Sequence, residues 1–203
     1  MSAQELHIIS TGKQHLEQFV EIASEIQDDV DFFHLREKQM NASELYRAVT
    51  LLQDQKIPLS KLIINDRADV AWTKQAFGVH LAFHSLDAAV VRRAFPGLGV
   101  GCSVHSMKEA KVACQQGADY AMYGHIFETD SKRGLPPKGV EELQAITSNV
   151  SLPIIAIGGI TPSNCQSVLE AGVRGIAVMS GILEAKKPME AVKEYSKSLG
   201  KVR

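Results

Sequence analysis

The stretch Asp119-Tyr-Ala-Met-Tyr-Gly-His-Ile-Phe-Glu-Thr-Asp-Ser-Lys132 contains the pattern that decides the fold. Residues 119–123 are mostly apolar and lie between Gly117 and Gly124, which is typical of a short buried strand. The chain then passes directly into a polar loop that begins with His125. Barrel enzymes carry ionisable side chains at the carboxyl ends of their strands. This stretch therefore predicts both a barrel strand and a candidate active site.

Other apolar runs have the same form, and a segment with helical spacing of apolar residues follows each one. The predicted strands are residues 6–10, 32–36, 62–65, 78–81, 98–103, 119–123, 153–157 and 175–179. Continuous apolar strands are expected where helices cover a parallel sheet. Eight such units in 203 residues favour a closed barrel over a doubly wound open sheet. We predict an α/β protein in which residues 1–203 form a single (β/α)8 TIM barrel domain.

Two of the predicted helices have recognisable starts. Ser106, followed by Glu109 three residues later, forms a capping-box pattern at the start of a helix. Thr161 as the cap and Pro162 as the first helical residue predict a helix that begins at Pro162.

The composition excludes several classes of function. Hydrophobic residues make up 45% of the chain, charged residues 22%, and the formal net charge is -1, as in soluble globular proteins. A near-neutral chain offers no basic surface for a polyanion, so we expect no nucleic-acid binding. No apolar run is long enough to span a membrane, and the amino-terminal residues lack the pattern of a signal peptide. We expect a cytoplasmic protein, and a homodimer is the commonest oligomer.

The cysteines point to the same compartment. Cys102, Cys114 and Cys165 are far apart, odd in number and without zinc-binding spacing. They are expected to be free thiols in a reducing environment. We predict no metal ion and no cofactor.

Polar and small residues follow the predicted strands in succession. In a barrel, the carboxyl ends of all strands meet at one rim, which forms the active site. The candidate rim residues are Ser10, Arg36, Lys38, Asn65, Asp66, Ser103, His125, Thr129, Lys132, Gly158, Gly159, Ser180 and Gly181. We expect this rim to bind a small anionic molecule.

The ends of the last two strands predict phosphate binding. Gly158-Gly159 and Ser180-Gly181 stand where barrels bind phosphate through backbone N–H groups, and glycine leaves those groups accessible. The alternative is that these glycines only form tight turns. We interpret the turns as a phosphate site because both carry the pattern.

Arg36 and Lys38 are candidates for holding an anion from the other side of the mouth. Residues two apart in an extended segment point to the same side. The alternative is a solvated salt bridge with Glu37 or Asp66, and the sequence leaves both open. Asp66 by itself is a weak magnesium site.

His125 is the candidate catalytic residue. An imidazole accepts and returns protons near neutral pH, and this one directly follows a strand-ending glycine. His105, in a loop, is the alternative. The histidines inside predicted strands, expected to pack in the barrel, are His7, His34 and His80.

Short motifs spread over nearly the whole chain resemble the thiamin-phosphate synthase superfamily. They include Arg36-Glu-Lys38, Gly78-Val-His-Leu81, Gly101-Cys-Ser-Val-His-Ser106, Ala156-Ile-Gly-Gly-Ile160 and Ala177-Val-Met-Ser-Gly-Ile182. That superfamily is a (β/α)8 barrel, so the resemblance implies the same fold. It also implies an enzyme of thiamin biosynthesis with a phosphorylated small-molecule substrate.

The chain departs from the synthase pattern at two strand ends. The synthase-like His-Leu-Gly-Gln-x-Asp is here His80-Leu-Ala-Phe-His-Ser85, so Phe83 replaces the glutamine and Ser85 the second magnesium aspartate. A pyrophosphate leaving group would lose half of its metal cage. The synthase-like Gly-Pro-x-x-x-Thr is here Gly124-His-Ile-Phe-Glu-Thr129, which replaces a proline by an acid–base group.

With both changes the chain resembles the thiazole tautomerases, the TenI proteins of bacilli. The resemblance implies an isomerase that converts 2-carboxy-4-methylthiazol-5(2H)-ylidene ethyl phosphate into the aromatic carboxythiazole phosphate, with His125 moving the proton. Arg36, Lys38 or Lys132 would hold the substrate carboxylate. Two alternatives stay open: thiamin-phosphate synthase activity, since the basic rim residues remain, and a non-catalytic regulatory role.

Overall fold

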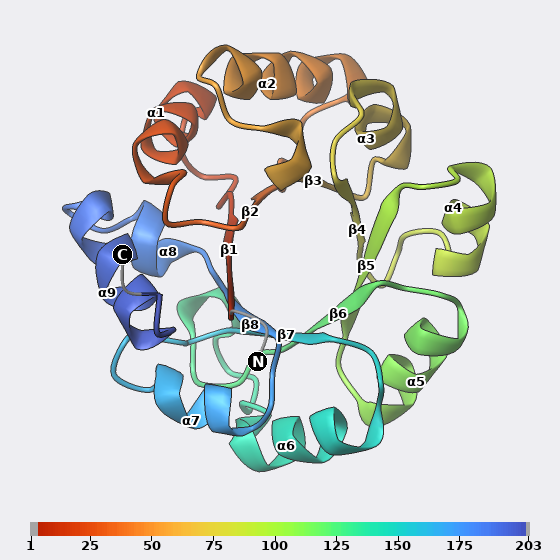
Figure 1. Ribbon diagram of the computed structural model, residues 1–203, viewed down its shortest axis with the longest axis vertical. Coiled ribbons are helices and arrows are strands. Elements are labelled where there is room, and N and C mark those ends of the chain that lie inside the picture. The colour runs from red at the N-terminus through yellow and green to blue at the C-terminus, as the bar shows by residue number, and fades with distance from the viewer. Residues whose placement is uncertain (1–3, 202–203) are drawn as a thin grey trace.

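The computed structural model describes residues 4–201, in which eight parallel strands close into a barrel in the order of the sequence (Figure 1). β1 pairs with both β2 and β8, which closes the ring. The strands are β1 (Glu5–Ile9), β2 (Phe32–Leu35), β3 (Leu62–Asn65), β4 (Gly78–Leu81), β5 (Gly99–Val104), β6 (Tyr120–Gly124), β7 (Ile154–Ile157) and β8 (Gly175–Val178). The predicted barrel is confirmed.

The helices form an outer ring around the strands (Figure 1). They are α1 (Leu16–Ile26), α2 (Ala42–Asp54), α3 (Ala68–Lys74), α4 (Ala88–Ala94), α5 (Met107–Gln115), α6 (Gly139–Asn149), α7 (Cys165–Glu170), α8 (Ser180–Leu183) and α9 (Pro188–Ser198), with short 3-10 turns η1 (Leu59–Lys61) and η2 (Asp130–Lys132). The sequence pattern missed α8 and both short turns.

Two hydrophobic clusters hold the barrel together. The larger one lies between the strands and the helices, and the smaller one fills the barrel interior. Alternate residues of a strand face opposite sides of the sheet, so Tyr123 belongs to the helix-facing cluster and Tyr120 to the interior. Strands such as β6 and β7 therefore carry apolar side chains on both faces, which explains their continuous apolar runs in the sequence.

The predicted start of the helix at Pro162 is wrong. α7 begins at Cys165, and Asn164 occupies the cap position. The Asn164 side chain points backward: its Nδ2 donates to the Gly159 carbonyl at 3.0 Å, and its Oδ1 accepts from the Thr161 N–H at 2.8 Å. These bonds close a turn that contains Pro162, so the helical hydrogen bonds start only after it.

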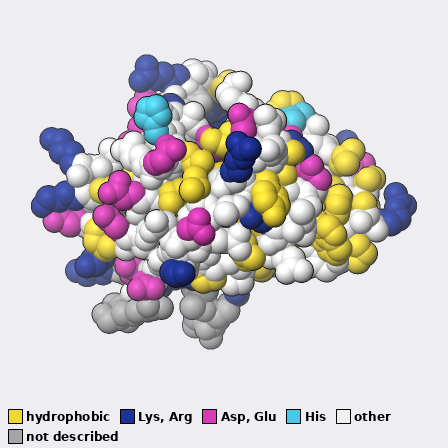
Figure 2. Space-filling view, turned by 90° about the horizontal axis from the view of Figure 1, so that it is seen from above, with side chains coloured by type: hydrophobic (Ala, Val, Ile, Leu, Met, Phe, Trp, Pro, Cys, Tyr) yellow, Lys and Arg dark blue, Asp and Glu magenta, His cyan; other side chains and the backbone are white. Residues whose placement is uncertain are grey.

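The cap predicted at Ser106 is confirmed, because its Oγ accepts from the Glu109 N–H at 3.2 Å. The cysteines are free thiols, as predicted. Within residues 4–201, no helix is both long and apolar enough to cross a membrane. On the described part of the face drawn in Figure 2, acidic, basic and hydrophobic side chains are interspersed. Such a surface agrees with the near-neutral net charge.

Candidate active site

The structure gathers most of the predicted site residues at the carboxyl end of the barrel. Asn65 ends β3, and Ser103 is the second-last residue of β5. The residues that directly follow a strand are Ser10, Arg36, Asp66, His125 and Gly158. Because parallel strands all point the same way, these side chains surround one rim.

His125 stands at the end of β6 and is 6% exposed. Its Nε2 lies 3.2 Å from the carbonyl oxygen of Leu135, in the loop between β6 and α6. A carbonyl oxygen can only accept, so Nε2 donates its proton, and the acceptor of a neutral imidazole in this position is Nδ1. No hydrogen-bond partner of Nδ1 is found among the described residues, and Nδ1 is not one of their fully buried side-chain atoms that lack a partner. The ring is thus held at one nitrogen and open at the other.

The glycines after β7 are required by the close packing of two loops. Gly158 has φ +100°, and a Cβ placed there would lie 2.3 Å from the Cβ of His125. Gly159 has φ +66°, and its Cβ would lie 2.4 Å from the Glu128 carbonyl oxygen. Both positions therefore exclude side chains whether or not an anion binds. This packing explains the glycines independently of the phosphate site predicted from the sequence.

The backbone nevertheless leaves donors free at the ends of β7 and β8. Among the described residues, the N–H groups of Gly159, Ser180 and Gly181 donate to no protein acceptor. Tyr195 Oη donates to the Ile160 carbonyl at 2.9 Å and packs where a Gly181 side chain would be, so it joins the two turns. Phosphate binding here stays a prediction, and these amides provide the donors for it.

Thr129 and Lys132 lie together in the loop between β6 and α6. They line a hollow of about 690 Å³ whose wall also contains Leu135, the hydrogen-bond partner of His125. Thr129 caps η2, and Lys132 is its last residue. The structure thus places a hydroxyl and an ammonium group on the loop that holds the catalytic candidate.

Arg36 and Lys38 do not share an extended segment. β2 ends at Leu35, and a turn closed by the Met40 N–H and the Glu37 carbonyl at 3.1 Å leaves Lys38 exposed. The extended segment on which the prediction relied is therefore absent, and a turn has no two-residue alternation that would align the two side chains. Neither residue forms an ion pair within the described chain, so the alternative salt bridges are also not found.

Arg36 remains part of the mouth. It is half-buried, its N–H donates to Ser10 Oγ at 2.8 Å, and its charge acts on His80 inside the barrel.

Asp66 is engaged by its neighbours. Ser85 Oγ donates to Asp66 Oδ1 at 2.5 Å, and His84 Nε2 lies 3.5 Å from Oδ2. A magnesium ion needs further hard oxygen ligands at this point. No group of three or more metal-binding side chains is found among residues 4–201. The residues here do not fit the metal cage of a synthase.

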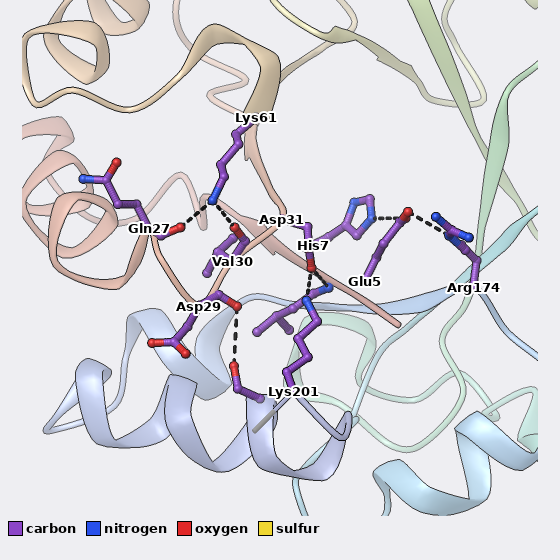
Figure 3. A network of polar contacts seen from close by, with 11 residues as sticks. Glu5, His7, Gln27, Asp29, Val30, Asp31, Lys61, Arg174 and Lys201 are labelled. Carbon is purple, nitrogen blue, oxygen red and sulfur yellow. Dashed lines mark hydrogen bonds and ion pairs between the residues drawn. The ribbon is translucent and has the colours of Figure 1, made fainter. Parts of the chain in front are cut away.

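The predicted core histidines are buried but not only packed. His7 Nδ1 lies 2.9 Å from His34 Nε2, and His7 Nε2 lies 3.3 Å from a Glu5 oxygen. Figure 3 shows Glu5 between His7 and Arg174, whose Nε donates to it at 2.7 Å. Burial lowers the pKa of His7, and that of His34 further. The hydrogen bonds from His7 and Arg174 outweigh burial and lower the pKa of Glu5.

Sequence reasoning missed Tyr120. Its hydroxyl lies 3.1 Å from His80 Nδ1, and His80 Nε2 lies 2.9 Å from Ser103 Oγ. The signal available in the sequence was Gly101, since a Cβ there would lie 2.0 Å from the Tyr120 ring. A glycine in the middle of a strand often marks such a close approach.

Comparisons with known proteins agree with the barrel fold. A family model described as thiamine monophosphate synthase matches residues 6–182. The thiamine-phosphate synthase of Chlorobium luteolum is 41% identical over 170 residues, covering 80% of this chain and 78% of that protein. The one from Coprothermobacter proteolyticus is 39% identical over 161 residues, covering 78% and 76%. The structure of thiamine phosphate pyrophosphorylase from Pyrococcus furiosus superposes with a TM-score of 0.82 at 32% identity, covering 97% and 95%.

Proposed function

The chain belongs to the thiamine monophosphate synthase family, and on that premise we propose that it is an enzyme of thiamine biosynthesis that isomerises a thiazole phosphate. The proposed substrate is 2-carboxy-4-methylthiazol-5(2H)-ylidene ethyl phosphate. The proposed product is the aromatic carboxythiazole phosphate. The predicted cytoplasmic location is consistent with a small-molecule enzyme of this kind.

The observation that carries the proposal is the state of His125. With Nε2 bonded to the Leu135 carbonyl, Nδ1 is the nitrogen that accepts a proton. In the proposed reaction the C2–H bond of the thiazole breaks and its proton moves to Nδ1. The ring double bonds then shift, and the same proton forms the new C–H bond at the exocyclic carbon. One base suffices because both carbon atoms belong to one conjugated system.

The phosphate provides the anchor. The unpaired N–H groups of Gly159, Ser180 and Gly181 would bind it. A phosphate held there keeps the ring at a constant distance from His125, which lowers the entropic part of the barrier.

Basic side chains would hold the carboxylate and stabilise the negative charge that develops when C2 loses its proton. Arg36 and Lys132 are half-buried on elements of the rim, which supports either in this role. Lys38 is exposed on a turn, so it is the least favoured of the three candidates. Asn65, Ser103 and Thr129 would add hydrogen bonds.

The second candidate function is thiamin-phosphate synthesis, which the names of the relatives favour. Synthesis would require magnesium beside Asp66 to stabilise the leaving pyrophosphate. The bonds from Ser85 and His84 to Asp66 weigh against this function in the present chain.

Two parallel assays separate the candidates. In the first, the non-aromatic thiazole phosphate is supplied, and the aromatic product is measured by its ultraviolet absorbance. In the second, the aminopyrimidine pyrophosphate and the thiazole phosphate are supplied with magnesium. We expect turnover in the first assay only. Magnesium-dependent turnover in the second assay, with none in the first, would replace the tautomerase by the synthase.

A further inference from the structure

Tyr120, His80 and Ser103 form a hydrogen-bonded line inside the barrel that ends at the mouth. Strand register places His80 beside Gly101 and Gly101 beside Tyr120, so the tyrosine ring reaches across the missing side chain. The hydroxyl of Tyr120 lies 3.1 Å from His80 Nδ1. Ser103 is two residues beyond Gly101 on β5, nearer the rim, and its Oγ lies 2.9 Å from His80 Nε2.

The line has one direction of hydrogen bonding because His80 is neutral. Burial, together with the charges of His7 and Arg36, lowers the pKa of His80 to about 3. A neutral imidazole carries one proton, so it donates at one nitrogen and accepts at the other. Either Tyr120 donates to Nδ1 and Nε2 donates to Ser103, or both bonds run the opposite way.

Burial of the phenol selects the first arrangement. Within residues 4–201, His80 Nδ1 is the only hydrogen-bond partner found for the Tyr120 hydroxyl. Burial raises the pKa of Tyr120 well above its usual value, so the phenol keeps its proton. If it accepted from Nδ1, its own O–H would be buried without an acceptor, which is unfavourable. Tyr120 therefore donates, and the His80 proton resides on Nε2.

The position of the His80 proton determines how the Ser103 hydroxyl can form hydrogen bonds. Its oxygen accepts from His80 Nε2, so its own proton is left to donate elsewhere. Ser103 is half-buried near the carboxyl end of β5, and no other hydrogen-bond partner of its side chain is found in the described chain. A hydroxyl held in this way favours a ligand atom that accepts and disfavours one that donates.

We propose that Tyr120 and His80 are positioning residues that make Ser103 a dedicated donor to an oxyanion of the bound ligand. The inference rests on the proposed function only in taking Ser103 as part of the ligand site. The shared chemistry of the candidate groups is an anionic oxygen, either of the carboxylate or of the phosphate.

A double-mutant cycle measures the coupling between Tyr120 and Ser103. The probes are the carboxythiazole ethyl phosphate, the same molecule without its carboxylate, and the same molecule without its phosphate, each followed by calorimetry. We expect Ser103→Ala and Tyr120→Phe each to weaken binding of the full molecule about tenfold, and the double variant to be no weaker than Ser103→Ala. The truncated probe whose binding no longer responds to Tyr120→Phe identifies the oxyanion by what it lacks.

Tyr123→Phe is the matched control, since Tyr123 is buried on the same strand but faces the helices. It should leave binding unchanged. Equal losses from Tyr123→Phe and Tyr120→Phe, or independent losses from Tyr120→Phe and Ser103→Ala, would overturn the proposal.

The nitrogen resonances of His80 in the wild-type protein give a test that does not depend on any variant folding. With ¹⁵N-labelled histidine, we expect the wild-type spectrum at neutral pH to show a protonated Nε2 and an unprotonated Nδ1 for His80. The chemical shifts of these two nitrogens should change in Tyr120→Phe. A protonated Nδ1 in the wild type would reverse the line and overturn the proposal. Absence of binding by all probes would instead reject the proposed function, and the spectrum would still decide the orientation of His80.

Discussion

Polar side chains on the two halves of the barrel rim, one near β3 and β4 and the other near β6 and β7, differ in their hydrogen bonding. Near β3 and β4, Ser85 and His84 engage the Asp66 carboxylate, while the Oδ1 of the neighbouring Asn65 has no hydrogen-bond partner among the described residues. Near β6 and β7, His125 has one nitrogen held by the Leu135 carbonyl and the other free. The first half resembles a metal site closed by internal hydrogen bonds. The second half resembles an acid–base site prepared for a ligand.

This difference indicates how one barrel can change its chemistry. A carboxylate that has gained a serine and a histidine as neighbours has less need of a cation, and less capacity to hold one. An imidazole at the end of β6, oriented by a backbone carbonyl, would provide proton transfer instead.

The largest expected effect is on the acid–base half. His125→Asn should lower tautomerase turnover by about 100- to 10,000-fold, the range that a general acid–base group supplies, with product affinity nearly unchanged. Steady-state kinetics and calorimetry measure both. The control is His105→Asn, because His105 also directly follows a strand and its ring bonds to Glu109. Comparable losses in the two variants would remove the special role of His125.

Next comes the packing that holds His125. Gly158→Ala combines an unfavourable φ of +100° with a Cβ that would lie 2.3 Å from the His125 Cβ. Gly97→Ala has a similar φ of +87° but nothing within 4 Å. We expect Gly97→Ala to lower the free energy of unfolding by about 1–3 kcal/mol, and Gly158→Ala by roughly twice that because of overpacking.

Denaturant unfolding measures both glycine variants, and turnover should fall only in Gly158→Ala. Equal free energies of unfolding for the two variants would mean that the loop after β7 can move to accommodate a Cβ at position 158 without displacing His125.

Acid should destabilise the folded barrel through its buried histidines. The pKa of His80 falls from 6.5 to about 3 on folding, so the unfolded chain binds more protons between these values. Its contribution to stability is present above pH 6.5 and is lost as the pH falls toward 3. At pH 5 this loss is about 2 kcal/mol for His80 alone. Thermal unfolding at pH 7.5 and pH 5 measures it.

The pH comparison has an internal control. Replacing the exposed His15 by Ala should leave the difference between the two pH values unchanged. A stability that does not change between pH 7.5 and pH 5 would contradict the buried, neutral state of the interior histidines.

The smallest effect is expected from restoring a carboxylate in the closed half. Ser85→Asp would place a second acid beside Asp66. Millimolar magnesium should then add about 1 kcal/mol or less to the free energy of unfolding, measured as a rise in the melting temperature. Wild type and the exposed Ser43→Asp should not respond. If magnesium stabilised the wild type as much as Ser85→Asp, the region around Asp66 would still bind a cation. That result would favour thiamin-phosphate synthase activity.

The barrel was predictable because its signal is local and repeated. A strand buried between helices and the barrel interior is mostly apolar, so runs such as Ile154–Ile157 stand out against the polar residues that follow them. His125 was predictable as a candidate because it directly follows such a run. The start of α7 was not, since the bonds of Asn164 to Gly159 and Thr161 depend on how the turn folds back.

Contacts between strands distant in sequence were beyond the reach of pattern. The approach of Tyr120 to His80 joins residues forty positions apart, and the only local trace of it is Gly101. The extended segment predicted for residues 36–38 is wrong for a related reason, because a turn interrupts the two-residue alternation there.

The sequence alone therefore determined the barrel, the rim and the candidate base, because apolar periodicity and the residue after each strand are properties of neighbouring positions. Only the tertiary structure decided which nitrogen of His125 is free, how Asp66 is engaged, and which way the hydrogen bonds of the interior run. Those properties depend on partners from other strands and loops, and closing the barrel is what brings them within hydrogen-bonding distance.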